Sequence, residues 1–145
     1  MIFNSILLER AYLQTRKSVP PNFGAKMKLR RRNALDKAYR LLQANPFIHY
    51  ENGKMLLLSE SKTKTGEAKF YETRSDECRL IEPGGFLCHA FWEGFPCWHR
   101  AAFEIVENYF EIIEESNLKN AAQTVSAVNS SVAVVNSKTA RQPPV

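Results

Sequence analysis

The spacing of apolar residues along the chain predicts two helices. In residues 31–45, RRNALDKAYRLLQAN, apolar side chains recur three or four positions apart and share one face of a helix that stops at Asn45-Pro46. Over residues 98–115 a similar stripe lies opposite a glutamate-rich side. We expect both stripes to face the core and to bury Leu35, Leu42, Phe103, Val106 and Phe110.

Between these helices, short runs rich in β-branched and aromatic residues alternate with turn signals. Asn52-Gly53 tolerates the positive φ angles of a tight hairpin turn, KTKTGEA predicts a second turn, and Pro83-Gly84-Gly85 predicts a third. Residues 46–91 therefore indicate a three- or four-stranded antiparallel meander. The expected fold class is α+β: a small antiparallel β-meander flanked by helices.

The ends of the chain differ from its middle. Residues 1–25 predict a helical segment followed by a linker at SVPPNFG, where paired prolines fix φ and remove backbone donors. Residues 26–116 would form the folded domain. Residues 117–145 are rich in Asn, Ser, Ala and Val and contain no aromatic residue, so we expect a mostly disordered tail.

Composition and cysteine count favour a cytoplasmic protein. No stretch approaches the roughly 20 apolar residues that span a bilayer, and the first residues lack the features of a signal peptide. Three cysteines cannot close a disulfide framework within one chain, so metal-bound or free thiols in a reducing compartment are expected.

Positive charge is concentrated near the N-terminus. Residues 1–50 carry ten Lys and Arg against Glu9 and Asp36, whereas the rest of the chain is slightly acidic. The run KMKLRRR could meet phosphates through its five cations, although a solvated charge run is an equally good interpretation. The nucleic-acid-binding candidates are Lys26, Lys28, Arg30, Arg31 and Arg32.

The stretch LCHAFWEGFPCWHRAAF, residues 87–103, concentrates the candidate chemistry. Cys97 and His99 stand one residue apart at the start of a helix and can aim sulfur and nitrogen at one point, which suits a tetrahedral zinc ion. Cys88 precedes Cys97 by nine residues. Cys78 and Cys88 lie symmetrically about residue 83, so a regular hairpin would set them opposite each other.

The fourth ligand has two candidates. We favour Cys78 over His89, because adjacent strand residues point to opposite faces and Cys88 already occupies the metal face. The expected zinc ligands are thus Cys78, Cys88, Cys97 and His99. Amides at the start of the helix could hydrogen-bond to the Cys97 sulfur.

Residues 46–112 resemble the SWIM-type zinc finger. In that family a Cys-x-Cys pair, a loop and a Cys-x-His pair form a ββα arrangement, and the segment from Gly94 and Pro96 through CWHRAA matches the family's end residue by residue. At the front, the family's first cysteine falls on Phe86, so Cys78 would replace it or the finger would be degenerate. The resemblance implies a zinc-binding module for DNA or protein contacts that is not itself an enzyme.

Two function classes follow. One is a non-catalytic zinc module that binds DNA or RNA through the basic run. The other is a zinc-stabilised module that binds a protein partner through its aromatic loop or the acidic face of helix 100–115. No Walker loop or His-Glu-x-x-His motif indicates an enzyme, a small-molecule substrate is not expected, and a nucleophilic Cys97 is less well supported than a metal ligand.

Overall fold

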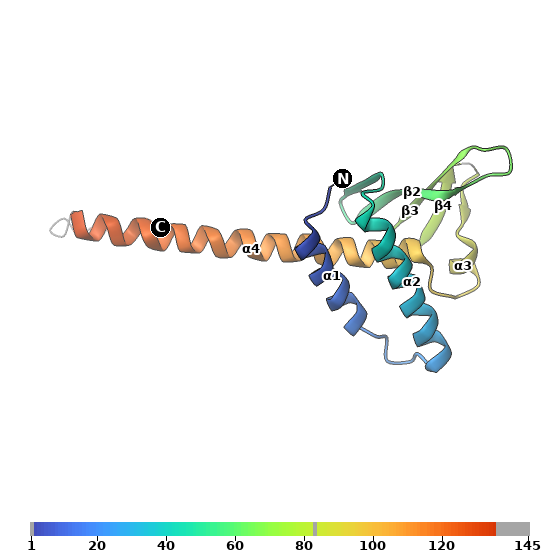
Figure 1. The fold of residues 1–145 in the computed structure, drawn as a ribbon, viewed down its shortest axis with the longest axis horizontal. Coiled ribbons are helices and arrows are strands. Elements are labelled where there is room, and N and C mark those ends of the chain that lie inside the picture. Colours follow the sequence, from blue (N-terminus) through green and yellow to red (C-terminus); the bar gives the residue numbers. More distant parts are fainter. Residues whose placement is uncertain (1, 83, 136–145) are drawn as a thin grey trace. The chain divides into compact units, whose positions relative to one another are not determined.

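The computed structural model describes residues 2–82 and 84–135, with the side chains of residues 60, 61 and 123–135 left out. Its fold is α+β, with a five-stranded antiparallel sheet in the order β1-β2-β3-β4-β5 and four helices in the described residues (Figure 1). Residues 1–110 form one compact unit and residues 111–145 a second. No helix in the described residues is long and apolar enough to cross a bilayer.

The sheet is a meander in which every strand pairs with its neighbour in sequence. Its strands are β1 (Ile48–Glu51), β2 (Lys54–Lys62), β3 (Ala68–Thr73), β4 (Cys78–Glu82) and β5 (Phe86–Leu87). The predicted meander is confirmed, with one more short strand than expected. The first turn has the expected chemistry, since Asn52 and Gly53 both take positive φ, 51° and 74°.

One face of the sheet is buried. Met55 pairs with Thr73, and Thr73 pairs with Cys78, so these three side chains share a face, and all three are fully buried. The register shift between β3 and β4 lies at Phe70 and Tyr71. The pairing of β4 with β5, the hairpin that carries Cys78 and leads to Cys88, has no register shift.

Helix α2 (Ala25–Gln43) starts six residues earlier than expected, directly after Gly24, whose backbone is extended. The basic run thus lies inside the helix. Its buried face consists of Ala34, Leu35, Ala38 and Leu42.

Helix α1 (Ser5–Lys17) begins at Asn4, whose side chain accepts hydrogen bonds from two backbone amides. The expected helix is present, but its buried face is Leu8, Ala11, Tyr12 and Thr15, whereas Ile6 and Leu13 are exposed. Helix α1 runs beside α2 in the opposite direction after the loop at residues 18–24 (Figure 1). Residues 1–25 therefore belong to the same compact unit as the sheet.

Helix α4 runs from Trp98 to Val135 and begins where the sequence predicts. Within the first unit it buries Phe103, Ile105 and Val106, while Phe110 stacks on Tyr50 at 5.0 Å between ring centroids. The helix continues through residues 117–135, where a disordered tail was expected, because that stretch contains neither glycine nor proline to stop it. Residues 136–145 lie outside the described residues.

Candidate metal centre

The β4–β5 hairpin places Cys78 and Cys88 opposite each other. Arg79 pairs with Leu87 and Leu80 with Phe86, and the same register sets Cys88 against Cys78. The Cys88 amide donates to the Cys78 carbonyl at 2.9 Å, which extends the ladder by one pair. The predicted symmetry about residue 83 is confirmed.

A short helix, α3 (His89–Trp92), and a glycine turn return the chain from Cys88 to Cys97. The Phe95 amide donates to the Ala90 carbonyl at 2.9 Å, and Gly94 takes a positive φ of 80°, which favours glycine. The segment between Cys88 and Cys97 therefore forms a compact turn before α4 begins.

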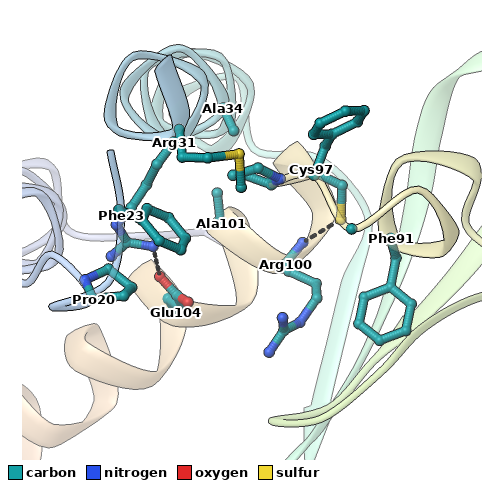
Figure 2. Close-up of a pocket in the computed structure, with 13 residues that line it drawn as sticks. Pro20, Phe23, Arg31, Ala34, Phe91, Cys97, Arg100, Ala101 and Glu104 are labelled. Carbon is teal, nitrogen blue, oxygen red and sulfur yellow. Dashed lines mark hydrogen bonds and ion pairs between the residues drawn. The ribbon is translucent and has the colours of Figure 1, made fainter. Parts of the chain in front are cut away.

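Cys97 lies immediately before the first turn of α4. The backbone amide of Arg100 donates to Cys97 Sγ at 3.4 Å (Figure 2). The amide of Ala101 donates to the Cys97 carbonyl at 3.1 Å. The Arg100 amide is one of the first-turn amides that no helical carbonyl can pair, so the sulfur caps the helix. The expected amide-to-sulfur contact is present.

The four predicted ligand residues converge. One ligand atom from each of Cys78, Cys88, Cys97 and His99 lies within 4.8 Å of the other three, and no other such cluster occurs among the described residues. All four side chains are buried, with at most 6% exposed. Tetrahedral zinc would set two sulfurs about 3.8 Å apart and a sulfur and nitrogen about 3.6 Å apart. Cys88 Sγ lies 3.7 Å from His99 Nδ1, so this donor set fits a metal ion.

The alternative ligand, His89, lies outside this cluster. Its side chain is 89% exposed, and its Nε2 lies 3.7 Å from Glu93 Oε1. Phe86 is 71% exposed. The structure therefore brings Cys78 to the cluster in preference to either residue.

The three thiols do not ionise independently. Hydrogen bonds from Cys78 and Cys97 hold the pKa of Cys88 far below its usual range, whereas hydrogen bonding to Cys88 and Cys97, together with burial, holds the pKa of Cys78 far above it. For Cys97 the hydrogen bond with Cys78 lowers the pKa, but hydrogen bonding to Cys88 and burial raise it to about 11. One thiolate is thus favoured, and a shared cation would be needed to ionise all three.

The imidazole of His99 is oriented by aromatic rings. Tyr71 stacks on it at 3.7 Å between centroids, with 19° between the planes, and Trp98 lies tilted at 4.3 Å. His99 Nε2 is buried without a hydrogen-bond partner in the described part of the chain, so Nδ1 is the nitrogen that faces sulfur. Burial, and then the nearby cysteine sulfurs, raise the pKa of Tyr71.

Sequence reasoning did not single out Tyr71. Its signal was weak, because the alternation in KFYETRS marks it only as one inward residue of a strand. Its role as a support for His99 depends on the pairing of β3 with β4, where Tyr71 lies opposite Leu80.

The five residues of the predicted basic patch do not share one environment. Lys26, Lys28 and Arg32 are exposed. Arg31 instead points inward: its side chain is 12% exposed and pairs with Glu104 at 2.9 Å (Figure 2). It also donates to the carbonyls of Thr15 and Ser18. Arg31 therefore joins α1, α2 and α4 and is not presented to a ligand.

Comparison with known proteins gives no match: no family model, no curated protein and no solved structure is similar to this chain.

Proposed function

We propose that Cys78, Cys88, Cys97 and His99 bind one zinc ion, and that the ion stabilises the fold and takes no part in catalysis. The observation that carries this proposal is the convergence of four buried donor atoms from three separate segments. Three thiolates and one imidazole are a usual donor set for structural zinc, whereas magnesium and calcium prefer oxygen.

The site is closed by protein ligands. Four side chains complete a tetrahedron, so no coordination position is left for a substrate or a nucleophilic water. A zinc ion with three thiolates carries a net charge of −1. The backbone amide of Arg100 donates to Cys97 Sγ, so it is positioned to offset part of that charge.

We further propose that the domain is a variant SWIM-type finger. Its Cys97-Trp98-His99 step at the start of α4 agrees with the family's Cys-x-His pair. The variant feature is the replacement of the first family cysteine, at Phe86, by Cys78 from the opposite strand of the hairpin.

The partner that we propose is nucleic acid, bound through the exposed and half-buried cations of α2. Lys26, Lys28, Arg30 and Arg32 remain from the predicted patch, and a run of cations on one helix is the usual electrostatic feature of phosphate binding. The second candidate is a protein partner, which the exposed Trp92 and Phe86, at 72% and 71%, would favour.

Metal content of purified variants tests the zinc proposal. Cys78→Ser, Cys88→Ser, Cys97→Ser and His99→Ala should each lose zinc, whereas His89→Ala, the matched control, should retain one ion per chain. If Cys78→Ser retains one zinc ion per chain and His89→Ala loses it, the fourth ligand is His89 and not Cys78. An unaltered protein that purifies without metal would contradict the zinc proposal.

Binding measurements on the zinc-loaded full chain test the nucleic-acid proposal. Labelled duplex and single-stranded DNA and RNA are titrated near 100 mM salt, where exposed charges are screened beyond about 10 Å. Binding that weakens as salt rises supports the proposal. If none of the four is bound, the protein-partner function takes its place.

A further inference from the structure

Helix α2 presents a second polar face that the run KMKLRRR only partly contains. Along α2, one set of polar residues recurs every three or four positions, and such spacing places residues on one face. The set is Lys26, Arg30, Asn33, Lys37 and Arg40. Four of these five residues are cationic, and they extend over about 21 Å of helix at 1.5 Å per residue. Lys28 and Arg32 fall on a different side of the helix.

A groove of about 520 Å³ lies beside the middle of this face. From α2 it is lined by Arg30, Asn33 and Lys37, and from the loop and the start of α4 by Phe95, Pro96 and Trp98. Cys88, Cys97 and His99 also line it, so the wall opposite α2 is the segment that the proposed zinc ion would fix.

Cations and aromatic rings are paired across this groove. The guanidinium carbon of Arg30 lies 3.9 Å from the centroid of the Phe95 ring, and Lys37 Nζ lies 5.4 Å from the Trp98 ring. Phe95 is 38% exposed, and Trp92, the last residue of α3 and the neighbour of the groove-lining Glu93, is 72% exposed. Positive charge that follows a groove, next to aromatic rings with accessible faces, is the arrangement that binds single-stranded nucleic acid.

We propose that this groove binds single-stranded nucleic acid. The phosphates contact the cationic face of α2, and bases stack on Trp92, which is exposed beside the groove, and against the part of Phe95 that Arg30 does not cover. This inference rests on the proposed nucleic-acid function and narrows it to one strand form and one face. Duplex bases are stacked on one another and hydrogen-bonded inward, so they cannot stack on these rings without being flipped out.

Glu93 allows a test in which the removal of a charge should strengthen binding. It carries the only carboxylate among the described residues that line the groove, and its side chain is 48% exposed. Its charge opposes a phosphate strand, so its removal should strengthen binding, whereas loss of a lysine or arginine on the opposite wall should weaken it.

The experiment uses the zinc-loaded full chain and fluorescein-labelled oligothymidine, oligoadenosine and a duplex of equal length. Fluorescence anisotropy gives affinity over a series of salt concentrations. Lys37→Gln and Arg40→Gln should each weaken single-strand binding and lower the log–log salt slope by about 0.7. Glu93→Gln should tighten it. Lys54→Gln, an exposed lysine of β2 outside the groove, is the matched control and should change neither quantity.

Stacking is measured separately. Trp92→Ala should weaken single-strand binding several-fold, leave the salt slope unchanged and remove most of the quenching of tryptophan fluorescence by the bound strand. Zinc content and circular dichroism confirm that each variant is folded.

Two results would contradict the groove as the binding site and leave the proposed nucleic-acid binding intact. One is duplex binding as tight as single-strand binding, with Trp92→Ala without effect. The other is a loss of affinity in Lys28→Gln and Arg32→Gln, with none in Lys37→Gln and Arg40→Gln. Absence of binding to every probe would overturn the groove and the proposed nucleic-acid function together.

Discussion

The helical core and the cysteine cluster are held together in different ways. The helices bury Leu8, Leu35 and Leu42, and α4 buries Phe103 and Val106; these apolar side chains require no hydrogen-bond partner or ligand. The cluster buries three sulfurs and an imidazole, together with Thr73 Oγ1 and His99 Nε2, which lack hydrogen-bond partners in the described residues. Burial stabilises the helical core. In the cysteine cluster, burial is favourable only if hydrogen bonds or a bound metal compensate the buried polar groups.

This difference indicates which region depends on a ligand. The formation of a hydrophobic core is favourable by itself, whereas two of the three crowded thiols, Cys78 and Cys97, resist ionisation until a cation joins them. We therefore expect the two regions to respond to different perturbations, and the following predictions are ordered from the largest expected effect to the smallest.

Removal of the metal should have the largest effect. Apparent zinc-binding free energies of zinc-finger peptides are roughly 10–16 kcal/mol, so a strong chelator should unfold residues 78–103. Hydrogen exchange should show loss of protection there before it appears in α1 and α2. Acid should act in the same direction, because protons compete with zinc for thiolates and imidazole as the pH falls. If residues 78–103 are equally protected from hydrogen exchange with and without chelator, the cysteine cluster does not depend on a metal and does not differ from the helical core in this respect.

Truncation in the helical core should have the next largest effect. Leu35 is 1% exposed, and Leu35→Ala should lower the free energy of unfolding by about 2–5 kcal/mol through lost burial and the cavity that remains. Leu29→Ala on the same helix is the control, since Leu29 is 58% exposed and should change stability by no more than about 0.5 kcal/mol. Urea denaturation of zinc-loaded protein measures both. Equal losses would show that α2 does not bury the predicted face.

Loss of the Arg31 contacts should have a smaller effect. Arg31→Met leaves Glu104 without its partner and removes donors from the carbonyls of Thr15 and Ser18, so stability should fall by about 1–3 kcal/mol. Arg32→Met, at an exposed position one residue later, should lie within about 0.5 kcal/mol of the unaltered protein. A larger loss from Arg32→Met would contradict this structural role.

Alkaline pH should destabilise the helical region modestly. Burial, and then the hydrogen bond to Asp36, raise the pKa of Tyr12 above 10.0. A raised folded-state pKa means that the contribution to stability is complete below about pH 10 and is lost as pH rises through the folded-state value. Thermal unfolding between pH 9 and 11 should show this fall, and it should be shallower in Tyr12→Phe. An identical slope in both proteins would assign the fall to other groups.

Removal of residues 118–145 should have the smallest effect. This segment contains no aromatic residue and offers little apolar surface, so the melting temperature of the shortened chain should match that of the full chain within error. A drop of many degrees would show that it stabilises the first unit.

The sequence by itself determined much of the site. Asn52-Gly53 required a tight turn, and the symmetry of Cys78 and Cys88 about residue 83 followed from counting, because strand pairing has a period of two residues. The start of α4 also followed from sequence, since the helical stripe begins next to the Cys-x-His step. In each case the determining residues are close together along the chain.

Only the tertiary structure decided the roles that depend on distant partners. Arg31 and Arg32 are adjacent and chemically identical, yet Arg31 meets Glu104, 73 positions away, while Arg32 remains exposed. Tyr71 supports His99 because the sheet packs against α4, and the division of the basic run between two faces of α2 became visible only when the helix was found to begin at Ala25. Local patterns fix spacing and direction, but the choice among identical side chains depends on which neighbours the fold brings to them.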